Sequence, residues 1–305
     1  MRKKISARKY FWGRCRSILE KIIPETSFAY KIIYLNAVKF QAKKRNKRKD
    51  KLFFQTNIVD SCNLNCIGCT VFSPLCDGGF ADLNSFEKDI KQIGILTNGG
   101  VEKIVLMGGE PLLHPQIKDF FEIVRKYIKT GEIAIITNGI LLLKQDVSFW
   151  ESCKTNDIKI YITPYPIKLD YEQIIKIAEK YSVDVEYFYV GNKDFFRKLP
   201  LNIEGKGNII ENFKRCTSSN TCVALRNGKM YGCQTIAYID YFNSYFGQNF
   251  KVLEKDYIDI HTAISEDEIL DFMCKPLPFC RYCEVDSMKF GIKWSISKKE
   301  IGEWV

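Results

Sequence analysis

The sequence predicts an α/β protein whose largest part is a partial (β/α)6-type parallel barrel. Residues 51–205 alternate between strand-like and helix-like segments, whereas residues 206–305 lose that alternation and hold six of the twelve cysteines. Residues 1–50 are strongly basic. We therefore expect a basic helical extension (1–50), a barrel (51–205), and a small cysteine-rich domain made of a β-hairpin plus a helix (206–305).

Five segments of the barrel region have the apolar character of strands. The segment VEKIVLM, residues 101–107, ends in the continuous apolar run of a strand that is covered on both faces. Five strand–helix units before residue 190 fit an open or partial barrel better than a complete eight-stranded one. The predicted strands are Leu52–Asp60, Val101–Met107, Ile133–Ile136, Ile158–Ile162 and Val183–Val190.

Helical periods separate these strands, with apolar side chains recurring every three or four residues. Asn84, followed by Glu87 three residues later, is predicted to cap the first helix. Regular βαβα order predicts parallel strands joined by right-handed crossovers. The three clearest stripes are Phe86, Ile90, Ile93 and Leu96; Ile117, Phe121, Val124 and Ile128; and Ile174, Ala178 and Tyr181.

The positive charge of the chain is concentrated at one end. The net charge is +10, but residues 1–50 carry 16 Lys and Arg against 3 Asp and Glu, which leaves 30 and 33 for the remaining 255 residues. A slightly acidic body argues against a nucleic-acid groove. No apolar run reaches the length of a membrane span and no secretory signal is evident, so we expect a cytoplasmic protein.

Three cysteines lie in one short loop after the first predicted strand. Cys62, Cys66 and Cys69 have the spacing C-x3-C-x2-C, and the local sequence offers no fourth thiol. Structural zinc and electron-transfer iron–sulfur clusters normally take four protein ligands. Three ligands would leave one iron of a [4Fe-4S] cluster open to a non-protein group, which favours a catalytic site. Zinc, or a ferredoxin-like cluster completed from elsewhere in the chain, is the alternative.

Further short polar sequences follow the next three strands. Gly108-Gly109-Glu110-Pro111 follows the second strand, Thr137-Asn138-Gly139 the third, and Thr163-Pro164-Tyr165 the fourth. Because functional loops of parallel α/β barrels collect at the carboxyl ends of the strands, these sequences should share one rim with the cysteine loop. Each has a plain alternative as a turn, and two glycines after a buried strand often form only a tight turn.

The triad, its place after the first strand, and Gly108-Gly109-Glu110 resemble the radical S-adenosylmethionine (radical SAM) superfamily. CNLNCIGCTVFSPL, ITNGILL and YITPYPI look like a subgroup associated with polysaccharide and natural-product pathways. The resemblance implies that the triad holds a [4Fe-4S] cluster whose open iron binds SAM. It also implies reductive cleavage of SAM to a 5′-deoxyadenosyl radical that abstracts hydrogen from a substrate.

The same resemblance suggests contacts to SAM. Gly108 and Gly109 would let the backbone approach the methionyl end of SAM, Glu110 would bind its ammonium, and Asn138 and Thr163 would contribute further contacts. Many family members carry an aromatic residue just before the third cysteine, where this chain has Gly68, so Phe72 is a candidate for the adenine contact instead.

The second cysteine group surrounds a predicted hairpin. VALRNGKMYGC, residues 223–233, should turn at Asn227-Gly228, which places Cys222 opposite Cys233. The spacing resembles the auxiliary-cluster region of SPASM and twitch domains, and six cysteines suffice for one auxiliary [4Fe-4S] cluster. The resemblance implies Cys216, Cys233, Cys280 and Cys283 as ligands, with Cys222 as the substitute. A zinc site is the alternative.

The remaining candidates have structural interpretations beside the functional ones. Cys76 is a candidate hydrogen donor to a substrate radical, although a buried apolar filler is the favoured interpretation. Cys15 and Cys153 are interpreted as structural. His114, at a predicted helix start, is expected to cap or pack rather than act as an acid or base.

The sequence is compatible with more than one substrate class. We favour oxidation or epimerisation of a small carbohydrate-like or natural-product intermediate. The alternatives are maturation of a ribosomally made peptide, or a non-enzymatic iron–sulfur or zinc redox protein. An electron donor such as flavodoxin or ferredoxin is expected.

The extension has its own pattern. Phe28, Ile32, Leu35 and Val38 form an apolar stripe, and the basic run Lys43–Lys51 follows. Docking on the barrel, an anionic membrane surface, or an acidic protein partner would each explain it.

Overall fold

The computed structural model describes residue 23, residues 27–33, residue 36, residues 46–188 and residues 194–305. Predictions that fall on the other residues, among them Cys15, Leu35 and Val38, lie outside the described residues. Within the described residues, no helix combines the length and the apolarity that crossing a bilayer would require.

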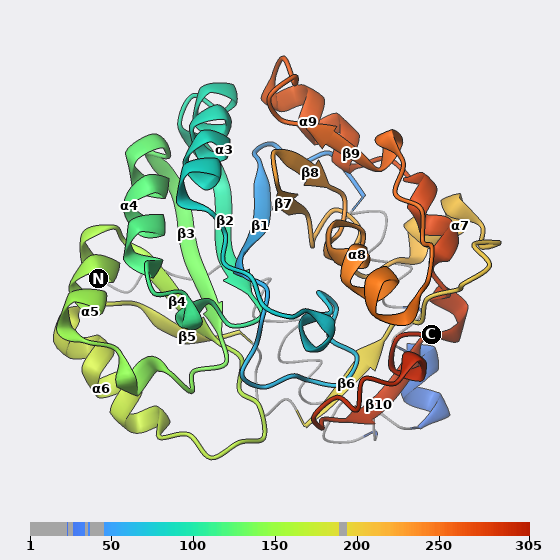
Figure 1. Ribbon diagram of the computed structural model, residues 1–305, viewed down its shortest axis with the longest axis horizontal. Coiled ribbons are helices and arrows are strands. Elements are labelled where there is room, and N and C mark those ends of the chain that lie inside the picture. The colour runs from blue at the N-terminus through green and yellow to red at the C-terminus, as the bar shows by residue number, and fades with distance from the viewer. Residues whose placement is uncertain (1–22, 24–26, 34–35, 37–45, 189–193) are drawn as a thin grey trace.

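A curved sheet of eight strands forms the centre of the structure, in the order β5-β4-β3-β2-β1-β7-β8-β9. Five neighbouring strands are parallel, as the alternating pattern predicts. They are β1 (Phe53–Val59), β2 (Gly100–Gly108), β3 (Thr130–Thr137), β4 (Ile158–Ile162) and β5 (Val185–Tyr187). The predicted α/β class with an incomplete parallel barrel is confirmed (Figure 1).

Helices connect the parallel strands and cover the outer side of the curved sheet (Figure 1). Their apolar stripes pack with the sheet into one large core, which includes Phe54, Ile104 and Ile133 from the strands. Burial of these side chains is the main stabilising contribution to this half of the molecule. The helices are α3 (Leu83–Leu96), α4 (Ile117–Tyr127), α5 (Val147–Thr155) and α6 (Tyr171–Tyr181).

The cap of the first helix lies two residues before the predicted one. Asp82, rather than Asn84, is the N-cap of α3, and its side chain accepts a hydrogen bond from the backbone N–H of Ser85. Glu87 does not complete a capping box, because Ser85 occupies the third position after Asp82; the Glu87 carboxylate instead binds Lys126 and Tyr127 on α4. The prediction of Asn84 as the cap is therefore wrong, although the helix itself is confirmed.

The predicted hairpin forms and continues the barrel sheet. β7 (Ala224–Arg226) and β8 (Lys229–Tyr231) are antiparallel, and Asn227 and Gly228 form the turn with φ values of 51° and 72°. β7 lies parallel to β1, with Gln55 opposite Ala224, and β9 (Tyr257–Asp259) follows β8. The sequence pattern therefore changes at residue 205, but strands from both sides of this position belong to the same sheet.

A second sheet also joins the two sides of that boundary. β6 (Phe195–Lys198) pairs antiparallel with β10 (Lys289–Lys293). Helices α7 (Ile209–Arg215), α8 (Gln234–Phe246) and α9 (Glu266–Met273) complete the region, with short 3-10 turns between them. A second apolar cluster packs α8 against Phe72, Phe279 and Trp304.

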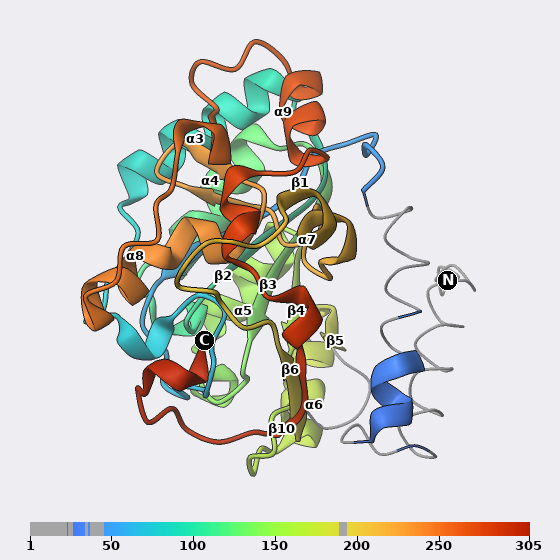
Figure 2. The same cartoon turned by 90° about the vertical axis from the view of Figure 1, so that its right-hand side faces the viewer.

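The described part of the basic extension docks on the protein body. Residues 28–33 are helical, and Figures 1 and 2 show this turn near β10. Tyr30 is buried, packs edge-on against Phe290 and accepts a hydrogen bond from Arg197. Phe28, by contrast, is 77% exposed. Tyr30, which lies outside the predicted stripe, therefore makes the contact with the protein body, and the role of the stripe stays open.

The glycine pair after β2 permits a close backbone approach. A Cβ atom on Gly108 would lie 2.0 Å from the carbonyl oxygen of Val59, and one on Gly109 would lie 2.0 Å from that of Ser61. The backbone N–H groups of Gly109 and Glu110 donate to these same two carbonyls. The pair therefore does more than form a turn: it holds the start of the cysteine loop against the end of β2.

We predict that Gly109→Ala destabilises the fold by at least about 2 kcal/mol, because a backbone overlap cannot be relieved by a side-chain rotation. Gly302→Ala is the matched control, since a Cβ atom there has no neighbour within 4 Å. That control should change the free energy of unfolding by less than about 0.5 kcal/mol. Urea denaturation of the metal-free protein measures both. Equal stabilities of the two variants would contradict the steric argument.

Candidate functional site

The three thiols of the first cysteine group lie around one tyrosine. Cys62, Cys66 and Cys69 follow β1, and all three are partly buried. Burial is the main cause that raises the pKa of Tyr165 well above its ordinary value. The charges of the three thiols and a hydrogen bond to Cys66 raise it further. Tyr165 follows β4, so thiols and hydroxyl meet at the shared carboxyl edge of the parallel strands.

Burial also governs the thiol of Cys62, raising its pKa to about 12, with smaller contributions from Glu110 and Cys69. Its Sγ accepts a hydrogen bond of 3.4 Å from the backbone N–H of Leu64. Thiols are soft donors that suit iron–sulfur clusters, and the three come from one loop on the functional rim. The donor set therefore fits a cluster held by three protein ligands.

The rim sequences are tied to one another through Glu110. Its carboxylate is buried and accepts hydrogen bonds from the backbone N–H of Leu112 at 3.1 Å, the Thr137 hydroxyl at 2.6 Å and the Asn138 N–H at 2.9 Å. Burial raises the pKa of Glu110 to about 7, although these three hydrogen bonds oppose the rise. Glu110 thus links the ends of β2 and β3, and its contact with the SAM ammonium stays a prediction.

Asn138 connects the rim to the cysteine loop. Its Nδ2 donates to Asn63 Oδ1 at 2.7 Å, and its Oδ1 accepts from the Ile140 N–H at 3.0 Å. Thr163 is buried one strand further on, where its N–H donates to the Thr137 carbonyl. The structure therefore brings Gly108, Gly109, Glu110, Asn138 and Thr163 together on one rim, as predicted, while their contacts with SAM stay predictions.

His114 has the packing role that the sequence predicts, but it does not cap α4, whose N-cap is Gln116. Its Nδ1 accepts a hydrogen bond from the Gln116 N–H at 3.0 Å. The ring packs edge-on against Phe80 and Phe120. Burial lowers the pKa of His114, so the neutral ring is favoured.

Two other single-residue predictions have definite positions. Phe72 is buried in the second apolar cluster against Phe242 and Trp304, which makes it a packing residue in this structure. The Cys76 thiol donates to the Ser73 carbonyl at 3.2 Å, and burial raises the pKa of Cys76. Cys153 lies in the main core, as expected of a structural cysteine.

A C-terminal strap, residues 294–304, covers the cysteine loop. The Ile67 N–H donates to the Ser295 carbonyl and the Ser297 N–H to the Asn65 carbonyl, both within 2.9 Å. Trp294 Nε1 lies 3.1 Å from Cys66 Sγ. The sequence offers no signal for this contact, because 228 residues separate the two partners.

The same strap explains why a glycine precedes the third cysteine. Gly68 has a φ of +59°, and a Cβ atom there would lie 3.1 Å from the Glu303 carbonyl. The Gly68 N–H donates to the Glu303 carboxylate, and the Trp304 indole N–H donates to the Cys69 carbonyl at 2.9 Å. A larger side chain at position 68 would meet the strap.

The second cysteine group gathers four thiols from three elements. Cys216 follows α7, Cys233 precedes α8, Cys280 lies in the 3-10 turn Pro278–Tyr282, and Cys283 follows that turn. All four line one apolar cavity. Burial raises the pKa of Cys283 far above its ordinary value, with further contributions from the other three thiols. These are the four cysteines that the sequence resemblance favours.

Cys222 lies near this group but does not line the cavity. Burial raises its pKa, and the charge of Cys216 adds to the rise. Cys274 ends α9, where its thiol donates to the Asp271 carbonyl. Among the described residues, no three His, Cys, Asp or Glu side chains converge closely enough to hold a single metal ion.

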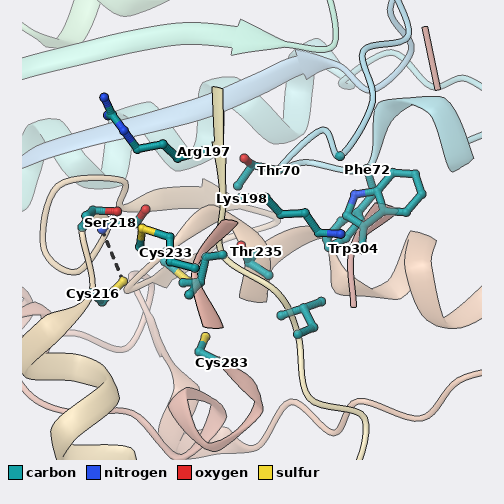
Figure 3. A pocket seen from close by; sticks show the side chains of 15 residues that line it. Thr70, Phe72, Arg197, Lys198, Cys216, Ser218, Cys233, Thr235, Cys283 and Trp304 are labelled. Carbon is teal, nitrogen blue, oxygen red and sulfur yellow. Dashed lines mark hydrogen bonds between the residues drawn. The ribbon is translucent and has the colours of Figure 1, made fainter. Parts of the chain in front are cut away.

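A cavity of about 140 Å³ lies between the two cysteine groups. Gly68 and Thr70, at the end of the first cysteine loop, line one part, and Cys216, Cys233 and Cys283 line another. Figure 3 shows these three cysteines on one side of the cavity, with Phe72 and Trp304 on the other. The two cysteine groups therefore lie in adjoining parts of one site region.

We predict that Glu110 makes the folded state less stable as the pH rises from 4.5 to 7. The pKa of about 7 in the folded state exceeds the ordinary value of 4.5, so the folded state binds more protons across this interval. The loss should reach up to about 3 kcal/mol, and Glu110→Gln should flatten the profile. Chemical denaturation of the metal-free protein at several pH values measures this.

Glu122→Gln, on an exposed position of α4, is the control and should keep the wild-type slope. A Glu110→Gln variant with the wild-type slope would contradict the assignment of the pH dependence to Glu110.

Comparisons with known proteins agree with the sequence resemblance. Residues 56–163 match the radical SAM superfamily. The GTP 3′,8-cyclase of Campylobacter fetus is 31% identical over 93 residues, which are 30% of this chain and 29% of that protein. The enzyme of the same name from Petrotoga mobilis is 30% identical over 92 residues, 30% of this chain and 28% of that protein. The chain thus spans less than a third of the length of these curated relatives.

The solved structures that this chain matches include BtrN in complex with AdoMet and 2-DOIA. It has a TM-score of 0.45 and 15% identity, and the match covers 77% of this chain and 94% of BtrN. Native anSMEcpe with bound AdoMet and the Cp18Cys peptide has a TM-score of 0.36 and 21% identity, covering 44% of this chain and 41% of that one.

The region matched to the superfamily contains the cysteine triad and the first two rim sequences, and it ends at Thr163. The predicted cofactors of this part, a [4Fe-4S] cluster and SAM, are those that the superfamily uses. Residues 56–163 therefore form a radical SAM domain, and the predicted superfamily is confirmed.

Proposed function

We propose that this chain is a radical SAM enzyme that holds its SAM-binding [4Fe-4S] cluster on Cys62, Cys66 and Cys69. The observation that carries the proposal is the meeting of these three thiols with Tyr165 at the carboxyl edge of the parallel sheet. When bound there, cluster and SAM supply one-electron cleavage of SAM to a 5′-deoxyadenosyl radical, which abstracts hydrogen from a substrate.

The chain's own residues would position these groups. Gly108 and Gly109 keep the cysteine loop against the end of β2, and Glu110 joins that strand end to Thr137 and Asn138. These contacts fix the rim before any ligand binds, which lowers the entropic cost of orienting SAM. The strap covers the loop and limits the access of water from that side.

We further propose that Cys216, Cys233, Cys280 and Cys283 bind one auxiliary [4Fe-4S] cluster. Four thiols around a cavity suit a cubane, in which each sulfur binds a different iron. Asn212 supports the arrangement, because its Nδ2 lies within hydrogen-bond distance of the Cys280 and Cys283 carbonyls. Accepting an electron from the substrate radical, or helping to hold the substrate, would be the role of this cluster.

The substrate class that we favour is a small carbohydrate-like or natural-product intermediate, undergoing oxidation or epimerisation. The similarity to GTP 3′,8-cyclase covers less than a third of this chain, so it does not support GTP as the substrate of this protein. A ribosomally made peptide is the competing substrate class. Cys76 remains the candidate hydrogen donor for an epimerisation. Its thiol lies close enough to Cys69 for the charge of Cys69 to contribute to the raised pKa of Cys76.

Partners and location follow from the same proposal. The reductant would be a flavodoxin or ferredoxin in the cytoplasm. Docking of the extension on the protein body is favoured, because Tyr30 contacts Arg197 and Phe290, and Arg48 pairs with Asp267 and Asp271. A membrane or protein partner for the remaining basic residues would be an additional role.

We predict that the anaerobically reconstituted, reduced protein converts SAM to 5′-deoxyadenosine without added substrate. Mass spectrometry detects the product. The Cys62/Cys66/Cys69 triple Ala variant should form none, whereas Cys274→Ala, outside both thiol groups, should behave as wild type. A reduced wild-type cluster that leaves SAM intact would instead support a non-enzymatic redox protein.

We predict that the triple Ala variant still binds about four iron ions, in the auxiliary site. In that background, Cys233→Ala or Cys283→Ala should abolish the remaining iron, because both thiols line the cavity. Cys222→Ala is the matched control and should retain it. Elemental analysis that finds zinc in place of iron would overturn the auxiliary-cluster assignment.

A further inference from the structure

The C-terminal strap brings one indole to a thiol of the first cysteine group. The Trp294 N–H donates to the Asp194 carbonyl at 2.8 Å, next to the β6–β10 sheet, which fixes the backbone at this position. Beyond it, Ile296 forms an antiparallel bridge with Cys66 itself. The backbone on both sides of the indole is therefore held relative to the cysteine loop.

The side-chain geometry is that of a hydrogen bond to sulfur. Trp294 Nε1 lies 3.1 Å from Cys66 Sγ, and the ring packs near Tyr165 with centroids 6.1 Å apart. An indole N–H is a donor only and has no lone pair to offer a metal. Its contribution to this site is therefore donation to the sulfur, not ligation.

We propose that Trp294 is a positioning residue that orients Cys66 as a cluster ligand and makes the cluster at this site easier to reduce. The inference rests on the proposed function of the triad. Hydrogen bonds to ligand sulfurs stabilise negative charge on them, and a cluster carries more negative charge after reduction than before it. The donated hydrogen bond therefore favours the reduced state.

Tyr165 is a second donor to the same sulfur, because its hydroxyl is hydrogen-bonded to Cys66. It comes from the barrel rim, whereas Trp294 comes from the strap. Cys66 therefore has a hydrogen-bond donor from each of these two segments, and both donors stabilise negative charge on its sulfur.

The test measures the reduction potential of the reconstituted full-length protein by EPR-monitored titration. The signal of the first site is identified by its absence from the Cys62/Cys66/Cys69 triple Ala variant. Trp294→Phe keeps the aromatic packing and removes the N–H, so the potential should become more negative. Trp304→Phe is the control, because its indole donates to the Cys69 carbonyl rather than to a sulfur, and it should leave the potential unchanged.

A second measurement uses the intact indole, so it does not depend on the stability of the Trp294 variant. Electron–nuclear double resonance of the reduced cluster, in wild-type and Trp304→Phe proteins labelled with ¹⁵N-tryptophan, should show coupling to a tryptophan nitrogen. A cluster without that coupling, or an unchanged potential in Trp294→Phe, overturns this inference alone. A wild-type protein that binds no cluster at the triad contradicts the proposed function as well.

Discussion

The confinement of the cysteine loop between two backbones is the constraint on which the site depends. On the barrel side, Gly108 and Gly109 allow the carbonyls of Val59 and Ser61 to approach the end of β2. On the other side, the strap pairs with the loop on both flanks of Cys66. Three thiols on a loop of irregular structure would otherwise sample many arrangements, and ordering them would oppose ligand binding. The geometry of the triad therefore depends on the barrel segments around residues 59–110 and on the C-terminal strap together.

Much of the fold follows from local patterns. The central strands β2 and β3 were predictable because each contains the continuous apolar run of a buried parallel strand, and β4 has the predicted bounds Ile158–Ile162. The cap of α3 was misplaced by two residues because Asp82, Asn84 and Ser85 are all plausible caps from sequence, and only the hydrogen bond to the Ser85 N–H distinguishes them. The contact of Tyr30 was not predictable because its partner, Phe290, belongs to β10, far along the chain.

In the candidate site, too, some contacts were predictable from the sequence and others were not. Loops after neighbouring parallel strands must share a rim, so the meeting of Glu110, Thr137 and Asn138 was foreseeable. The roles of Trp294 and Glu303 were not, since they arise from pairing between segments more than 200 residues apart in sequence. The departure at Gly68 shows the difference clearly. In the sequence, Gly68 only stands where many family members have an aromatic residue. In the structure, the absence of a side chain at this position allows the strap to pass close to the cysteine loop.

The placement of β7 beside β1 has a consequence for synthesis on the ribosome. β1 is among the first strands to be synthesised, yet one of its two neighbouring strands is β7, which contains Ala224. That edge of β1 therefore stays unpaired until more than 220 residues have been synthesised. An unpaired strand edge is a template for wrong pairing. Prompt closure by the hairpin would protect the newborn chain, and a ribosome that pauses before this segment would leave it open to aggregation.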